Sequence, residues 1–370
     1  MRWKNGLNML DFEKTYTLPF KFEIPNYIQE FLNKNFLIKS WVKFVKRYLY
    51  LNLKSQKLLE VSNILPEHNY ILWINISAPS LGDSLMDLSS RIFLNGKKVD
   101  LFTDKKNSDL YKDDLIFSKI YTEKKYVVQN KYDLVIIDSY STRSIHIKAD
   151  IARLIPFVGM FGFFNGPEVN RVLFSFHQMN KLLGYKKNES QINCMAKSTI
   201  SVSNADKKIV QNFNLPMHFI SIALGGEWSY RSYLNWNKVI KEIIEKDIDL
   251  NIVLLGSSNA KYISKEIAGE FPHYNIFDCV DQFTFNQTSQ IIKKSQILLC
   301  CDGGLMHAAN SVNTPIVALL ARLSSEMQLT DSVKAFSLYD KNNVNNILVQ
   351  DVLMKYEEAS NFVRIHRLDE

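Results

Sequence analysis

The sequence predicts an α/β protein with two Rossmann-like domains that face a central cleft, preceded by an N-terminal helical extension. Short apolar runs suited to buried parallel strands alternate with helical patterns in two successive series of about 130 residues each. In each series one such run ends in a turn of small residues that leads into a helix. The clearer case is Asp302-Gly303-Gly304 after the run 297–301. Adjacent glycines permit a sharp turn and a close backbone approach to a ligand.

These two series define the expected domain organisation. The helical extension covers residues 1–66, the first Rossmann-like domain 67–214 and the second 215–335. A C-terminal helical segment, 336–370, completes the chain, and its return to the first domain is left open.

The extension has a helical pattern from Tyr27 to Leu59, in which apolar residues recur at spacings of three and four with lysines between them. A basic amphipathic helix of this kind can lie on an anionic membrane. The alternative, which we prefer, is that its apolar face packs on the first domain and its lysines are solvated.

Composition is ordinary for a globular protein of 370 residues, with 46% hydrophobic and 22% charged residues. The net charge of +7 suits an anionic partner such as a nucleotide, a phosphorylated lipid or a membrane surface, but is equally common without one. The four cysteines form no C-x-x-C pair, so we expect reduced core thiols. No apolar run suits a transmembrane helix or a signal peptide, so we expect a cytoplasmic protein.

Asp83 is the candidate catalytic base. It follows Gly82 after the apolar run 71–76, in the first turn between a strand and a helix. A carboxylate at the carboxyl end of a parallel strand projects into the crevice of an open sheet, where it could take the proton of an attacking hydroxyl. Capping of the following helix is the alternative, because aspartate is favoured there.

Arg143 and Ser144 follow the apolar strand 132–138 in a polar stretch. A guanidinium at the end of a strand suits bidentate binding of a phosphate. The alternative is an arginine held in a surface salt bridge.

The segment from Asp302 to His307 is the candidate anion site. Backbone amides at the start of its helix can bind a phosphate, and His307 lies on the first helical turn. The alternative is an ordinary strand–turn–helix connection with a hydrogen-bonded histidine.

These segments resemble glycosyltransferase family 9, which includes the ADP-heptose:lipopolysaccharide heptosyltransferases. Asp302, Gly304 and His307 match its D-S/T-G-x-x-H segment, and Gly303 stands where the family has serine or threonine. The resemblance covers residues 70–320 and implies two domains of the GT-B type. Gly82 with Asp83 matches the family's catalytic turn, and Arg143 with Ser144 matches an Arg-Ser pair near an anionic group of the acceptor.

The resemblance also implies the donor site. The diphosphate of the sugar donor would be held by the following residues: Arg231, Asp302, Gly303, Gly304, Leu305, Met306 and His307. Arg231 and Trp236 fit the family's cationic loop only with a shift in spacing. Asp302 is expected to fix the turn and contact sugar hydroxyls, because like charges would repel phosphate. The loop 257–259 has no acidic residue, where some heptosyltransferases bind the ribose through a glutamate.

The implied activity is an inverting transfer of a sugar, heptose from ADP-heptose, to a lipopolysaccharide or lipooligosaccharide core acceptor. The partners would be a nucleotide-sugar donor and an anionic glycolipid; peripheral contact with the inner membrane is open, and no nucleic acid is expected. We expect the chain to lack the D-x-D signature of metal-dependent sugar transferases and any cluster of metal ligands, so helix dipole and cationic side chains would stabilise the leaving group without metal or cofactor. The absence of G-x-G-x-x-G and Walker motifs disfavours dehydrogenases and P-loop proteins.

Three alternatives stay open. Gly303, the shifted Arg231 and the missing ribose carboxylate would also suit a non-catalytic nucleotide-sugar-binding protein with a degenerate site. A family 9 transferase that uses another nucleotide sugar is the second alternative, and a sugar 2-epimerase of the GT-B type is a weaker third.

Overall fold

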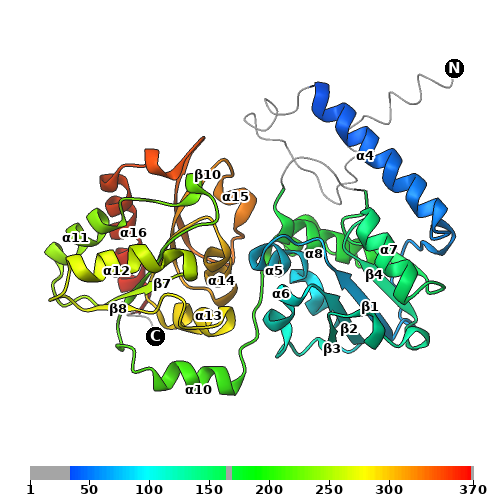
Figure 1. The fold of residues 1–370 in the computed structure, drawn as a ribbon, viewed down its shortest axis with the longest axis horizontal. Helices are drawn as coiled ribbons and strands as arrows, with labels where there is room; N and C mark the ends of the chain where they lie inside the picture. Colours follow the sequence, from blue (N-terminus) through cyan, green and yellow to red (C-terminus); the bar gives the residue numbers. More distant parts are fainter. Residues whose placement is uncertain (1–33, 164–168, 368–370) are drawn as a thin grey trace. The chain divides into compact units, whose positions relative to one another are not determined.

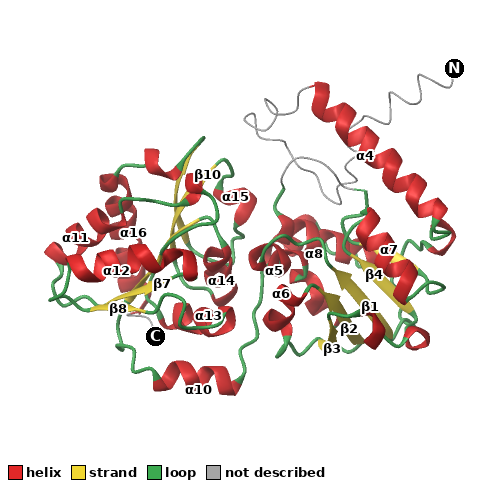
Figure 2. Ribbon diagram, viewed as in Figure 1, coloured by secondary structure: helices red, strands yellow, loops and turns green. Residues whose placement is uncertain are grey.

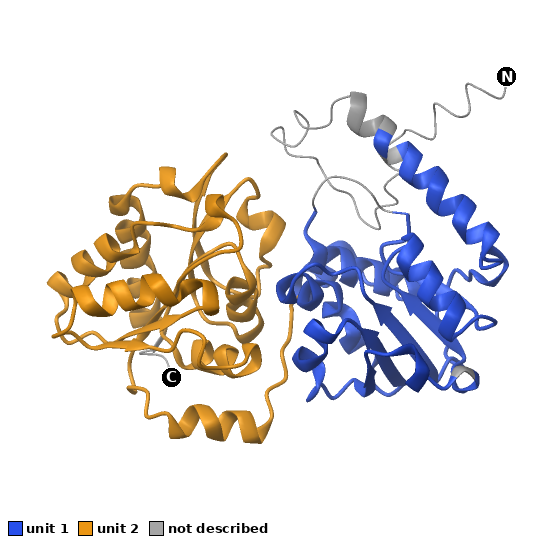
Figure 3. Cartoon of the chain, viewed as in Figure 1, with its two compact units in different colours: residues 1–196 blue, residues 197–370 orange. Residues whose placement is uncertain are grey.

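The computed structural model describes residues 34–163 and 169–367, which belong to two compact units, 1–196 and 197–370 (Figure 3). Each unit is built around one parallel sheet covered by helices (Figure 1 and Figure 2). The sequence analysis divided the chain between residues 214 and 215. The structure divides it earlier, because the helix Asn204–Asn212 packs in the second unit against the helix Phe285–Lys294.

The first unit contains a five-stranded sheet with the order β3-β2-β1-β4-β5. Its strands are β1 Tyr70–Asn75, β2 Lys98–Thr103, β3 Phe117–Tyr121, β4 Leu134–Ile137 and β5 Phe157–Gly159. Its helices are α4 Lys34–Leu53, α5 Leu81–Asp87, α6 Lys105–Ser108, α7 Thr142–Ile151, α8 Arg171–Leu182 and α9 Glu189–Met195. Short 3-10 helices are η2 Lys57–Leu59, η3 Ser89–Leu94, η4 Asp109–Tyr111, η5 Lys124–Tyr126 and η6 Gln129–Lys131.

The second unit contains a six-stranded sheet with the order β11-β10-β9-β6-β7-β8. Its strands are β6 Ile220–Ala223, β7 Ile252–Leu255, β8 Ile276–Asp278, β9 Leu298–Cys301, β10 Ile316–Ala321 and β11 Ala335–Asp340. Its helices are α10 Asn204–Asn212, α11 Trp236–Lys246, α12 Lys261–Glu270, α13 Phe285–Lys294, α14 Gly304–Val312, α15 Ser325–Gln328 and α16 Val349–Arg367. Short 3-10 helices are η7 Ser229–Arg231, η8 Ser258–Ala260 and η9 Val344–Asn346.

Strand order reverses once in each sheet. The first sheet grows from β1 through β2 to β3 and then returns to the other side of β1 with β4, in the register Ile71 opposite Leu134. The second sheet grows from β6 through β7 to β8 and returns to the other side of β6 with β9, in the register Ile222 opposite Leu299. Doubly wound sheets of this kind bind ligands at the carboxyl ends of the two strands that flank such a reversal.

Both faces of the second sheet are buried, as its apolar strands predict. Successive side chains point to opposite faces of a strand. Ile252 and Leu254 of β7 therefore lie in one apolar cluster, and Val253 and Leu255 in another. The first cluster includes residues of α11, α12 and α16, and the second includes residues of α13 and α14. The sheet is thus a rigid platform for the loops at its edge.

Several elements differ from what their local sequence favours. The β-branched residues Ile200 and Val202 favour a strand, but the segment Ile200–Ser203 lies outside both sheets, and the side chain of Ser203 caps α10. The polar strand β3, the short strand β5 and the half-buried strand β11 were not expected. β11 pairs with β10, so the sheet of the second unit extends into the segment 336–370. α16 packs on β11, β10 and α11, and its return to the first domain stays a prediction.

The helix of the N-terminal extension is α4, and the expected stretch before residue 34 lies outside the described residues. Leu51 is buried in the core of the first unit, and the ring of Phe44 lies 4.7 Å from that of Phe163. The following apolar residues of α4 are exposed: Trp41, Val42, Leu49 and Leu53. One side of α4 therefore packs on the domain and another faces solvent. Among the described residues, no helix combines the length and the apolar character that a membrane span requires.

Candidate functional site

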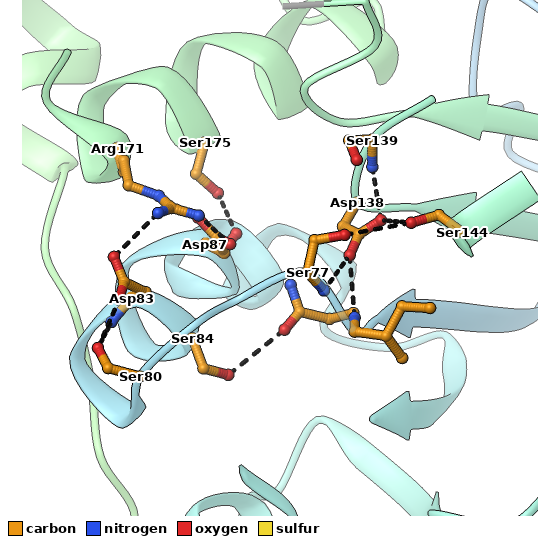
Figure 4. Close-up of polar contacts among 12 residues, drawn as sticks. Ser77, Ser80, Asp83, Ser84, Asp87, Asp138, Ser139, Ser144, Arg171 and Ser175 are labelled. Atoms are coloured by element: carbon orange, nitrogen blue, oxygen red, sulfur yellow. Dashed lines mark hydrogen bonds and ion pairs between the residues drawn. The ribbon is translucent and has the colours of Figure 1, made fainter. Parts of the chain in front are cut away.

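One candidate site lies in the first unit, at the reversal of strand order between β1 and β4. The loop after β1 leads to Asp83, and the loop after β4 leads to Asp138, Arg143 and Ser144. Figure 4 shows the polar contacts of Asp83, Asp138 and Ser144. The parallel sheet brings Asp83, Arg143 and Ser144 to one edge of the first unit.

Asp83 lies in the first turn of α5, not in the turn before it. Its backbone amide donates to the hydroxyl of Ser80 over 3.2 Å, and this hydroxyl donates to the Asp83 carboxylate over 2.5 Å. The other carboxylate oxygen accepts from Arg171 over 2.9 Å, and the side chain is 23% exposed. Ser80, and not Asp83, is therefore the residue that caps α5, while the Asp83 carboxylate keeps partial access to solvent.

Arg171, at the start of α8, joins Asp83 to a second carboxylate. Its guanidinium donates to Asp87 over 2.7 Å and 2.5 Å (Figure 4). Asp87 is only 2% exposed, and burial raises its pKa to about 6, although the nearby Arg171 opposes this rise. Arg171 therefore forms ion pairs with two carboxylates, the partly exposed one of Asp83 and the buried one of Asp87. The sequence analysis missed both Arg171 and Asp87, because 84 residues separate them and no local pattern joins them.

Asp138 anchors the loop that leads to Asp83. Its buried carboxylate accepts from the amides of Ile76 and Ser77 over 2.9 and 2.8 Å, and from the amide of Ser139 over 2.6 Å. Ser144 donates its hydroxyl to the same carboxylate over 2.6 Å. Two strands that flank the reversal are thereby tied together by one side chain. Four hydrogen bonds satisfy a buried carboxylate that would otherwise be costly to desolvate.

Ser144 is fully buried, so its hydroxyl holds Asp138 instead of facing an acceptor. Arg143 lies in the first turn of α7, where its guanidinium donates to the carbonyl of Ile76 over 2.7 Å and to Asp104 over 2.5 Å. The side chain of Arg143 is 59% exposed. The salt bridge proposed as the alternative therefore exists, and the exposed guanidinium remains accessible to an anion.

Another candidate site lies in the second unit, at the reversal of strand order between β6 and β9. Arg231 comes from the loop after β6, and Asp302 directly follows β9. A guanidinium nitrogen of Arg231 lies 3.0 Å from a carboxylate oxygen of Asp302, whose side chain is 2% exposed. The ring of Tyr230 lies 5.3 Å from the Arg231 guanidinium and accepts a hydrogen bond at its hydroxyl from Nε over 3.0 Å. Asp302 and Tyr230 thus orient Arg231 at this edge.

The turn after Asp302 begins α14 without a side-chain cap. Gly303 is the N-cap residue and has an extended backbone, and a Cβ at this position would meet open space. Serine or threonine would therefore fit sterically, and its hydroxyl would satisfy one of the amides at the start of the helix. With glycine, these amides depend more on water or a ligand.

The residues at the start of α14 differ in their exposure. Gly304 and Leu305 are half-buried, whereas Met306 is buried in the core and its amide donates to the carbonyl of Gly303 over 3.1 Å. His307 is 4% exposed and lies one residue further into the helix. The expected amide contact of Met306 would therefore require this hydrogen bond to open.

The loop after β7 carries no carboxylate, as the sequence indicated. Asn259 donates to the carbonyl of Gly226 over 3.0 Å and accepts from Ser257 over 2.8 Å. This loop is therefore joined to the loop that leads to Arg231, and its polar groups are an amide and hydroxyls.

The expectation that the chain lacks a D-x-D signature is wrong as stated, because Asp247-Ile248-Asp249 is such a tripeptide. It is exposed and lies between α11 and the amino end of β7. The candidate site lies at the carboxyl ends of the strands, so this tripeptide is at the opposite edge of the sheet. Within residues 34–163 and 169–367, no three metal-ligating side chains form a group that could hold an ion.

Comparison with known proteins gives a consistent assignment. The sequence model of glycosyltransferase family 9 (heptosyltransferase) matches residues 164–356, just over half of the chain. A search of curated proteins finds no match.

Three solved structures share the fold. A family 9 glycosyl transferase from Veillonella parvula is 13% identical with a TM-score of 0.66, over 80% of this chain and 98% of that one. The E. coli ADP-heptose lps heptosyltransferase II is 18% identical with a TM-score of 0.62, over 78% and 98% of the two chains. The E. coli heptosyltransferase WaaC with ADP is 14% identical with a TM-score of 0.58, over 79% and 98%.

At these sequence identities, the solved structures establish only the fold, which is the expected pair of Rossmann-like domains. The match to the family model establishes membership of the family. Together with the two strand reversals and their polar residues, they show that this chain belongs to glycosyltransferase family 9.

Proposed function

We propose that this glycosyltransferase moves heptose from ADP-heptose to the core of a lipopolysaccharide or lipooligosaccharide, with inversion at the anomeric carbon and without a metal ion. The observation that carries this proposal is the location of the candidate residues. Asp83 and Asp302 come from different units, and each lies at the carboxyl edge of a parallel sheet beside the reversal of strand order. Such edges bind ligands in doubly wound folds.

Asp83 would act as the general base. Its carboxylate is partly exposed and is held by Ser80 and Arg171, so it has a fixed orientation. The oxygen of the acceptor hydroxyl would attack the anomeric carbon while its proton passes to Asp83, and the bond from that carbon to the diphosphate would break. Arg143 would attract an anionic group of the acceptor, with Ser144 acting indirectly through Asp138.

The donor diphosphate would lie at the start of α14. Amides there and the guanidinium of Arg231 would stabilise the charge that develops on the leaving group. Asp302 would orient Arg231 and contact sugar hydroxyls, and His307 would reach a phosphate from the first turns of the helix. Two solved structures support this choice of donor, since the E. coli heptosyltransferase WaaC was solved once with ADP and once with ADP-2-deoxy-2-fluoro heptose.

The acceptor would be an anionic glycolipid, so we propose a cytoplasmic protein with peripheral contact at the inner membrane. The exposed apolar side chains of α4 and its lysines favour this contact.

A second candidate function is supported by the same residues. Gly303 and the loop 257–259 depart from the family pattern, which favours either a transferase that uses another nucleotide sugar or a protein that binds one without turnover.

Asp83→Asn tests the base. We predict that kcat falls by a factor of about 10² to 10⁴, because asparagine cannot accept the proton. Donor affinity, measured by calorimetry, and thermal stability should hardly change. Asp206→Asn is a matched control, because Asp206 makes the same pair of contacts with Ser203 at the start of α10. A role in capping alone would leave kcat unchanged in both variants.

Asp87→Asn tests the pH dependence of this buried pair. Burial raises the pKa of Asp87 to about 6, so between about pH 4 and pH 6 the native protein holds a proton there that the unfolded chain has released, and the free energy of unfolding should fall as the pH rises. Asparagine cannot titrate, so this part of the fall should be absent from the variant. Chemical denaturation at a series of pH values measures it, and an equal fall in both proteins would contradict the prediction.

Arg231→Gln and His307→Ala should each weaken binding of ADP by about tenfold and leave binding of adenosine unchanged, because each removes a contact to phosphate. Calorimetry with the two ligands separates these effects. Equal losses for ADP and adenosine would mean that the two residues shape the fold and do not touch phosphate.

Transfer should persist in excess chelator, because cationic side chains and the helix start would stabilise the leaving group. The measurement is release of nucleoside diphosphate from the nucleotide sugar, with and without acceptor. Activity that is abolished by chelator and restored by magnesium or manganese would contradict metal independence. Donor binding without any release would favour the non-catalytic alternative.

A further inference from the structure

Arg322 lies at the same sheet edge as the proposed donor site. It directly follows β10, which pairs with β9, and β9 in turn pairs with β6. Arg322, Asp302 and Arg231 therefore come from the carboxyl ends of three neighbouring parallel strands. The 3-10 helix η7, which ends at Arg231, packs against β10.

The guanidiniums of Arg322 and Arg231 both lie over the aromatic ring of Tyr230. The guanidinium carbon of Arg322 lies 3.7 Å from the centroid of Tyr230, and that of Arg231 lies 5.3 Å from it. Tyr230 itself packs against the core of the second unit. A guanidinium is attracted to the face of an aromatic ring, so Tyr230 holds two like charges close together that would otherwise repel each other.

These charges are not balanced within the described part of the chain. Arg231 is paired with Asp302 at 3.0 Å. No described carboxylate lies within ion-pair distance of Arg322, whose side chain is exposed. Arg322 therefore adds an exposed guanidinium, without an ion-pair partner among the described residues, to the edge that carries the uncapped start of α14, which has a partial positive charge of its own.

The backbone of Arg322 is strained. Its φ is 68°, in the left-handed region of the backbone, which residues other than glycine, asparagine and aspartate rarely adopt. Its amide donates to the carbonyl of Asp340 over 3.3 Å, which ties the residue to the end of β11. Strain of this kind is common at ligand sites. Glycine would relieve it, so we attribute a function to the arginine side chain.

We propose that Arg322 and Arg231, held together on Tyr230, form a pair of guanidiniums that binds the pyrophosphate group of the donor. Planar guanidiniums suit bidentate contacts to phosphate oxygens, and two of them match the two phosphates. Arg231 would serve the phosphate nearer to Asp302 and α14, and Arg322 the other. This inference rests on the proposed donor site and adds a residue that lies outside the D-x-G-x-x-H segment.

The experiment measures binding of inorganic pyrophosphate and of ADP to the full chain by calorimetry. Arg322→Gln keeps the length of the side chain and removes its charge, and we expect both affinities to fall by about tenfold. Adenosine should bind as before. Arg322→Lys should recover only part of the loss, because an ammonium restores charge without the planar stack on Tyr230. Arg364→Gln, an exposed arginine of α16, controls for net charge and should have no effect.

The outcomes separate this inference from the proposed function. Wild-type affinity in Arg322→Gln, together with a loss in Arg231→Gln, would overturn the role of Arg322 and leave the donor site intact. Wild-type affinity in both variants, or no binding of pyrophosphate by the wild-type protein, would overturn the donor site as well. A loss in Arg364→Gln equal to that in Arg322→Gln would show a general charge effect and would also contradict the inference.

Discussion

Parallel pairing of strands is the constraint on which the candidate site depends. All strand pairs in both sheets are parallel, so the loops that follow neighbouring strands emerge at one edge. The reversal of strand order beside β1 and β6 then leaves two loops that diverge to opposite faces of the sheet. Polar residues at that point can face a ligand without disturbing the apolar packing that covers both faces.

Each unit uses a buried carboxylate to fix this edge. The Asp138 carboxylate accepts hydrogen bonds from three backbone amides and one hydroxyl, and these bonds fix the conformation of the loop between β1 and α5. Asp302 pairs with Arg231 across the gap between β9 and the loop after β6. Burial makes such carboxylates costly unless they are paired, so each one strongly favours the loop conformation that satisfies it. Preorganised groups of this kind are what electrostatic stabilisation of a leaving group requires.

The sequence could predict those elements that depend on residues close together along the chain, but not those that depend on residues far apart along it. The strands β1 and β9 have continuous apolar runs, because they are buried on both faces, and the runs 71–76 and 297–301 predict their positions to within a residue. The strand β3 was missed because its exposed residues include Ser118 and Lys119, which give no apolar run. The segment Ile200–Ser203 has residues typical of a strand but no partner within the sheets.

The same distinction holds for the site. Asp83, Asp302 and His307 lie in local turn motifs that a single sequence can display. Arg171 contacts Asp83 from 88 positions along the chain, and Arg322 meets Tyr230 only through the order of strands in the sheet. The burial of Ser144 likewise follows from its bond to Asp138 and not from its neighbours in sequence. Such contacts become visible only when the topology is known.

We propose that the edge between β6 and β9 binds the diphosphate of a nucleotide sugar. Amide hydrogen exchange, measured by mass spectrometry with and without ADP, tests this binding most directly. We expect slower exchange in the peptides that contain residues 229–232 and 303–307, because the ligand would order these amides, and no change in the exposed turn 247–249 at the opposite edge. Bound ADP that leaves exchange in 303–307 unchanged, or that protects 247–249 instead, would contradict the account.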